Sequence, residues 1–151
     1  MPVVKKMSDL FADKIAEIPA PDPARARGRP IVAAFTSTNA ADDSLGSVYL
    51  LASLPSDCVL DTRTFFKVDN TGFAAIRIGT LTDPEALVSV LKSAGAFAEP
   101  VTRGGAAHGK PLWEVLGLES DPGGFIDIFQ HAIANATGAG TLVGEFHYRY
   151  R

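Results

Sequence analysis

The stretch GTLVGEFHYRY (residues 140–150) decides the fold class, because apolar and polar residues alternate along most of its length. An alternation with a period of two is the pattern of a β-strand with one buried face. The stretch therefore predicts a strand with one face in a core and the other in contact with water or a partner. The predicted core face consists of Leu142, Gly144, Phe146, Tyr148 and Tyr150, and the opposite face of Val143, Glu145, His147, Arg149 and Arg151.

Short apolar runs separated by turn residues fill the chain upstream of this strand, which is typical of a β-sandwich or barrel. The segment Asp69-Asn70-Thr71-Gly72 is the clearest turn, because Asn and Gly accept a positive φ at low cost. We predict a mainly β fold, an antiparallel, jelly-roll-like β-sandwich over residues 31–151. The other expected strands cover residues 31–37, 48–54, 58–60 with 62–68 (together one strand or a bent pair), 73–79, 112–118 and 125–134.

One inserted helix is expected within the sandwich. The segment Thr82-Asp83-Pro84-Glu85 has the spacing of a capping box, with proline at a position that favours a helix start. Apolar residues follow at helical spacing, and Gly95 favours an end. We therefore predict a helix over residues 84–94, packed on one face or across an open end of the sandwich. Its apolar face would consist of Leu87, Val90, Leu91 and Ala94.

The first thirty residues differ from the rest of the 151-residue chain in net charge and in residue pattern. Residues 1–30 carry a net charge of +2 and residues 31–151 a net charge of −5. A short helix is expected from Asp9, and three prolines then favour extended backbone. A disordered leader is one interpretation; the other, which we favour, is an N-terminal arm that binds a partner or a neighbouring copy. The candidate partner-binding residues of this arm are Phe11, Ile15, Ile18, Arg25, Arg27 and Arg29.

Composition and charge argue against several classes of protein. The acidic body, and the lack of aromatic residues between the arm's arginines, argue against direct nucleic-acid binding. The longest uncharged stretch, residues 128–144, is interrupted by polar residues, so no membrane span is expected. Asp9 and Asp13 stand where a signal peptide would be apolar. The single cysteine fits synthesis in a reducing cytoplasm.

No residue pattern indicates catalysis, a metal or a cofactor. The loop from Gly104 to Pro111 resembles a phosphate-binding loop, but Pro111 stands where a hydroxyl is needed and a strand is expected to follow. His108, His131 and His147 have none of the spacings of a zinc site. Cys58 is expected to be a buried, inert cysteine. We therefore predict a protein that is not an enzyme and holds no cofactor.

The order of segments resembles the small virion structural proteins of tailed bacteriophages. The segments that carry the likeness are ARARGRP (24–30), DSLGSVYLLASLPSDCVLDTRTFFKVD (43–69), FAAIRIGTL (73–81), GKPLWEVLGLESDPGGFIDIF (109–129) and GAGTLVGEFHYRY (138–150). The likeness covers most of residues 25–151, but not the region of the expected helix or the loop at 104–109. The matching positions are Gly46, Ser47, Leu54, Pro55, Gly79, Gly140, Thr141, Leu142, Gly144 and Tyr148.

This resemblance implies a non-enzymatic capsid decoration (cement) protein that binds the major capsid protein of a tailed phage. It also implies a place on the capsid surface of the virion, after synthesis in the host cytoplasm. We expect a homo-oligomer, with a trimer as one option. A tail, neck or baseplate component is the alternative. A second alternative is a carbohydrate-binding β-sandwich module that uses Trp113, Tyr148 and Tyr150 for stacking, although the alternation around them favours core positions.

Overall fold

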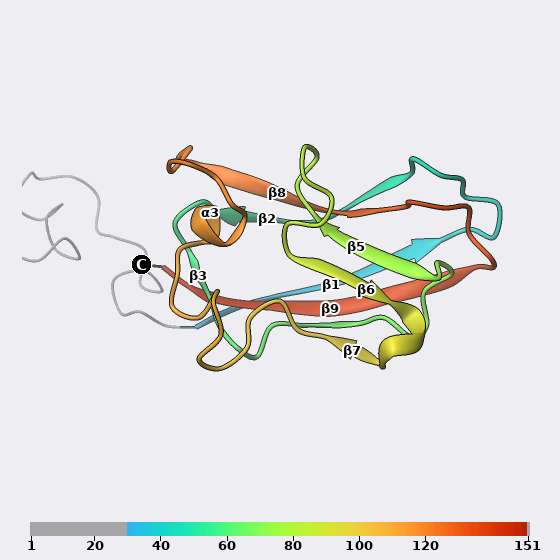
Figure 1. Cartoon of the computed structure of the whole chain (residues 1–151), viewed down its shortest axis with the longest axis horizontal. Helices are drawn as coiled ribbons and strands as arrows, with labels where there is room; N and C mark the ends of the chain where they lie inside the picture. The colour runs from blue at the N-terminus through green and yellow to red at the C-terminus, as the bar shows by residue number, and fades with distance from the viewer. Residues whose placement is uncertain (1–29, 151) are drawn as a thin grey trace, which may run out of the picture.

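The computed structural model describes residues 30–150, which form two antiparallel sheets packed against each other as a β-sandwich (Figure 1). The larger sheet has the order β1-β9-β4-β7, with β3 also paired to β9, and the smaller has the order β2-β8-β5-β6. The prediction of a mainly β sandwich is confirmed. The strands are β1 (Ile31–Asn39), β2 (Val48–Pro55), β3 (Val59–Leu60), β4 (Phe65–Lys67), β5 (Ala75–Gly79), β6 (Val88–Leu91), β7 (Phe97–Ala98), β8 (Phe125–His131) and β9 (Gly140–Arg149).

β9 lies at the centre of the larger sheet, as its alternating sequence predicts. It pairs with β1 on one side and with β3 and β4 on the other. Leu142 and Phe146 are buried, whereas Val143 and Arg149 on the opposite face are exposed. The predicted division of the two faces of this strand is therefore confirmed.

The core between the sheets is built from the inward-facing residues of the strands. Phe66 and Phe146 are fully buried, with their rings 5.3 Å apart and edge to face, and the ring of Phe35 lies 5.5 Å from that of Phe146. The smaller sheet contributes Ile76 and Ile128, which are also fully buried. Burying such side chains is the main source of the stability of a domain of this kind.

The prediction of a helix over residues 84–94 is wrong, because this segment contains β6, the second strand of a hairpin with β5. The Leu87 N–H donates to the Ile78 carbonyl at 2.9 Å, and Val88–Leu91 then pairs with β5 as β6. Val88 is buried, Ser89 is exposed and Val90 is half-buried, so burial alternates along this segment with the period of a strand. The apparent capping box is a turn, in which the Asp83 N–H donates to Thr80 Oγ1 at 3.1 Å. Only a short 3₁₀ turn, η1 (Lys92–Ala94), follows.

The strand predicted over residues 112–118 is also wrong, because a short helix, α3 (Leu112–Val115), begins there. The backbone N–H groups of Leu112 and Trp113 donate to the carbonyls of Cys58 and Ser56, at 2.7 and 3.0 Å. These bonds hold α3 against the chain that enters β3, at one end of the sandwich (Figure 1). Leu112 and Leu116 are buried there, so their apolar side chains close the end of the core and do not belong to a strand.

Candidate functional site

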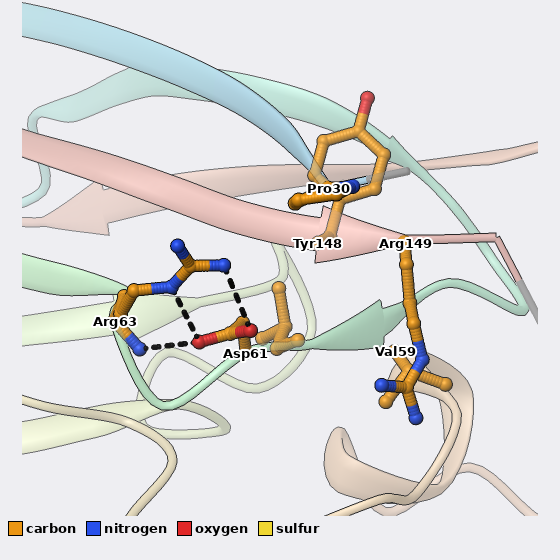
Figure 2. A pocket seen from close by; sticks show the side chains of 7 residues that line it. Pro30, Val59, Asp61, Arg63, Tyr148 and Arg149 are labelled. Atoms are coloured by element: carbon orange, nitrogen blue, oxygen red, sulfur yellow. Dashed lines mark hydrogen bonds and ion pairs between the residues drawn. The ribbon is translucent and has the colours of Figure 1, made fainter. Parts of the chain in front are cut away.

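A small pocket lies at the end of the larger sheet where β1 begins and β9 ends (Figure 2). Its cavity volume is about 130 Å³. Because Pro30 is the last residue of the arm and the first residue that the structure describes, the pocket marks the place where the arm joins the body. The lining residues are Pro30, Val59, Leu60, Asp61, Arg63, Tyr148 and Arg149.

The turn after β3 places the acidic and basic groups of the pocket. β3 pairs with the end of β9, and the Asp61 N–H continues this pairing by donating to the His147 carbonyl at 2.7 Å. The Thr64 N–H then donates to the Asp61 carbonyl at 3.0 Å and closes the turn. The chain therefore reverses at the pocket mouth and holds Asp61 and Arg63 on one tight loop.

Asp61 and Arg63 form a two-pronged ion pair. Arg63 Nε lies 3.0 Å from Asp61 Oδ1 and Nη2 lies 3.2 Å from Oδ2, and the Arg63 backbone N–H also donates to Oδ1. These hydrogen bonds, from the side chain first and then from the backbone, lower the pKa of Asp61. The Asp61 carboxylate is therefore already bound by Arg63. The pair forms part of the pocket wall and does not present a free carboxylate to a ligand.

Arg149 is a second cationic side chain that lines this pocket. Figure 2 shows its side chain extending past Val59, away from the pair of Asp61 and Arg63. No carboxylate among residues 30–150 forms an ion pair with it. Arg149 also lines a second hollow of about 70 Å³, together with Thr62, His108 and Gly109 among others. A guanidinium in this position can engage an incoming carboxylate with two hydrogen bonds.

The size of these hollows limits what they can hold. Pockets for small molecules usually have volumes of roughly 300–1,000 Å³, and the hollows beside Arg149 measure about 130 and 70 Å³. They fit a single side chain or a carboxylate group better than a metabolite. The arrangement is therefore suited to receiving part of a protein partner.

An apolar groove lies between the edges of the two sheets, along β6 and β7. Its volume is about 370 Å³, and its walls include Val68, Val90, Leu91 and Phe97. Leu91 and Phe97 are 58% and 60% exposed, which is unusual for large apolar side chains within a groove. The sequence did not reveal this surface, because residues 84–94 were predicted as a helix with Leu91 on its buried face.

The six candidate partner-binding residues of the arm lie outside the described residues 30–150: Phe11, Ile15, Ile18, Arg25, Arg27 and Arg29. Their role stays a prediction. What the structure adds is their point of attachment, since the chain enters the body at Pro30, in the wall of the pocket. Asp61, Arg63 and Arg149 were missed by sequence reasoning, because single charged residues in turns and at strand ends carry no motif.

The remaining residues considered from the sequence are placed apart. Cys58 is fully buried, as expected, and burial, followed by the charge of Asp57, raises its pKa to about 12. His131 Nε2 contacts the Thr80 carbonyl at 2.8 Å, and His147 Nε2 contacts Glu145 Oε2 at 2.6 Å. Among the described residues, no three His, Cys, Asp or Glu side chains are grouped to hold a metal ion.

The glycine-rich loop before Pro111 is largely exposed, as expected for a surface loop. The Gly104 N–H donates to Nδ1 of His108 at 2.9 Å, so the loop is tied to itself. The element that follows is the four-residue helix α3 instead of the expected strand. This correction does not restore a phosphate-binding loop, because α3 is a single helical turn and Pro111 supplies no hydroxyl.

The aromatic residues of the carbohydrate-binding alternative lie on two elements. Trp113 is half-buried on α3, whereas Tyr148 belongs to the end of β9 and packs against the core. The rings of Tyr148 and Tyr150 are 6.3 Å apart in an edge-to-face arrangement. Because Tyr148 contacts both the core and the Tyr150 ring, part of its ring surface is already used in packing.

Comparisons with protein-family models, with curated proteins and with solved structures found no match to the chain. Within residues 30–150, no helix is long and apolar enough to cross a membrane.

Proposed function

We propose that this chain is a non-enzymatic structural protein of a tailed-phage virion, a capsid decoration protein that binds the major capsid protein through its N-terminal arm. The observation that carries the proposal is the position of the arm's attachment. Pro30, the residue that joins arm and body, lines a pocket of side-chain size next to Arg149, which has no ion-pair partner within the described residues. The point where the arm joins the body and the pocket therefore lie on one face, suited to a protein partner.

The resemblance to virion proteins supports the proposal because its shared positions serve the scaffold. Gly46 has a φ of +94° in a turn, a conformation that favours glycine. A Cβ atom at Gly79 would clash with the Asp83 carbonyl oxygen. A protein that reinforces a shell needs such a fixed scaffold with surfaces for neighbours, and many weak contacts over the shell add up to strong attachment.

The proposal is tested first by locating the chain in virions of the phage that encodes it. Gold-labelled antibodies raised against the purified chain are applied to intact particles and imaged by electron microscopy. Label over the whole head surface is the expected result. Label confined to the tail, neck or baseplate would replace decoration by the alternative structural role, and unlabelled particles would overturn both.

The role of the arm is tested with the full-length chain and particles that lack it. Replacing Arg25, Arg27 and Arg29 together by glutamine removes three positive charges and is expected to abolish co-sedimentation with the particles. A matched control replaces Lys67, Arg103 and Lys110 on the body by glutamine, with the same loss of charge. Equal binding by the arm variant and the unmodified chain would show that these arginines have no part in attachment.

A further inference from the structure

Among the strands of residues 30–150, β1 forms one edge of the larger sheet, with β9 as its neighbour on one side and no strand on the other. It pairs with β9 over nine consecutive residue pairs, from Ile31 with Tyr148 to Asn39 with Gly140, without a register shift. No other strand of the described region pairs with it. Its sequence, IVAAFTSTN, contains no proline and no charged residue. The strand is therefore long, regular and uncharged, and on one of its two sides no strand of residues 30–150 pairs with it.

The hydrogen bonds of β9 on the side away from β1 show which backbone groups of β1 face the free side. The carbonyl of His147 accepts from Asp61 N–H and from Thr64 Oγ1, and its N–H donates to Thr64 Oγ1. Both groups therefore point away from β1. In an antiparallel pair successive residues point to alternate sides, so Val32, which is opposite His147, directs its own backbone groups to the free side.

The hydrogen bonds at the other end of β9 show that the same alternate residues of β1 point to the free side. The Thr141 N–H donates to the Asn70 carbonyl at 2.8 Å, away from Thr38, its opposite residue on β1. Every second residue of β1 therefore presents one N–H and one C=O at the free edge. These residues are Val32, Ala34, Thr36 and Thr38, and their side chains are all exposed on the outer face of the sheet.

β2, β6 and β7, the strands at the other outer edges of the two sheets, carry features by which proteins prevent strand pairing. β2 has a register shift between Leu50 and Ala52 and ends at Pro55. β6 has four residues and runs directly into the turn η1, and β7 has only two residues. Within Ile31–Asn39, β1 has none of these features, and its nearest proline, Pro30, lies just before the strand. An edge left open in a fold that protects its other edges indicates a surface for pairing.

We propose that β1 pairs with β1 of a second copy of this chain, antiparallel and about a two-fold axis at Phe35. In this register Val32 lies opposite Thr38 of the second copy, and Ala34 lies opposite Thr36. Each of these pairs then exchanges two backbone hydrogen bonds, so all the outward groups are satisfied at once. The two five-stranded sheets become one continuous sheet across the dimer.

The chemistry of the edge favours a second copy over an unrelated strand. A two-fold axis at Phe35 makes the edge complementary to itself, because the outward residues are spaced symmetrically about that position. The opposed side chains are small or β-branched and none is charged, so no like charges meet and the pairs suit a sheet surface. This interface does not depend on the capsid role, since it uses only the β-sandwich.

The register is tested by cysteine cross-linking in the full-length chain. Val32→Cys and Thr38→Cys are made singly and together, and the native Cys58 does not interfere because it is fully buried. With oxidised glutathione, the double variant is expected to form a disulfide-linked dimer, because a hydrogen-bonded pair has Cα atoms about 5.5 Å apart. Either single variant is expected to stay uncross-linked, because its two copies would lie about 20 Å apart.

Equal cross-linking of the single and double variants would overturn the proposed register. A second measurement addresses the dimer itself, through the mass of the full-length chain in sedimentation equilibrium. Thr36→Lys is expected to reduce the mass from two chains to one, whereas Ser53→Lys, at an exposed position on the protected edge strand β2, leaves it unchanged. A monomeric unmodified chain would overturn the proposal, and the edge would then be covered by its own N-terminal residues or by a strand of another protein.

Discussion

Cys58 is the residue whose chemistry the fold changes most. It stands next to Asp57, just before β3, and is completely buried. Burial disfavours the thiolate, and the neighbouring carboxylate adds to this effect, so the pKa rises from 9.0 to about 12. The thiol is therefore protonated in the folded protein throughout the physiological range, as expected for an inert core residue.

This shift predicts a loss of stability in alkaline solution. Between pH 9 and 12 the unfolded chain releases the Cys58 proton while the folded chain retains it, so the free energy of unfolding falls as the pH rises. From pH 8 to pH 10 the expected decrease due to this thiol is about 1.4 kcal/mol. The measurement is urea denaturation at both pH values, for the unmodified chain and for Cys58→Ala.

Cys58→Ala is the control, because Tyr49 also contributes to the loss of stability at high pH. In the unfolded chain Tyr49 loses its proton near its ordinary pKa of 10.0, whereas in the folded chain it retains it. Burial and the hydrogen bond to Asp43 raise the pKa of Tyr49 to about 12, so its contribution is present in both proteins. Cys58→Ala should be less stable at pH 8, because it leaves a small cavity, but its stability should fall less steeply with pH. Parallel curves for the two proteins would contradict the assignment.

At the scale of elements, β9 depends on a glycine that has no side chain to clash with its neighbours. A Cβ atom at Gly144 would lie 2.6 Å from the Phe65 carbonyl oxygen and 2.7 Å from the ring of Phe35. Both neighbours are fixed, one in β4 and the other among the core aromatics. Glycine at this position lets the aromatic rings approach the middle of the central strand.

Gly144→Ala is therefore expected to lower the free energy of unfolding by about 1–3 kcal/mol, the usual cost of overpacking a core. Gly95→Ala is the matched control, because Gly95 has extended backbone with a φ of 162° and a Cβ atom added there would meet no atom within 4 Å. Its stability should be unchanged or raised by less than about 1 kcal/mol. Chemical denaturation of both variants measures the difference, and equal stabilities would contradict this explanation.

Strands and helices were predictable where the periodicity of apolar residues agreed with the strand pairing in the folded protein. In β9 the alternation of residues extends over most of the strand and matches the burial from Leu142 to Phe146. In residues 84–94, Leu87, Val90 and Ala94 fit a helix as well as a strand, and only the hydrogen bonds to β5 settle the choice. In residues 112–118 the short helix is fixed by bonds to the Cys58 and Ser56 carbonyls, which are about 55 residues away and leave no local signal.

At the scale of the whole molecule, the candidate site arises from chain ends that meet in space. Pro30 and Arg149 are separated by nearly the entire body in sequence, yet they line one pocket because β1 and β9 are antiparallel neighbours. The sequence predicted most of the strands, but not β6 and β7, and it showed the charge difference between arm and body. The position of the pocket follows from the strand order, which depends on long-range pairing that composition and motifs do not encode.

The dimer through β1 predicts a thermal stability that depends on concentration, because association stabilises the folded chain by mass action. With an unfolding enthalpy of roughly 0.7 kcal/mol per residue, the midpoint should rise by about 3 °C for each tenfold increase in concentration. Differential scanning calorimetry of the full-length chain measures this. Thr36→Lys, which places a charge on the paired edge, should have a midpoint independent of concentration, and Ser53→Lys should behave like the unmodified chain. A constant midpoint in the unmodified chain would mean that folding and association through this edge are not coupled.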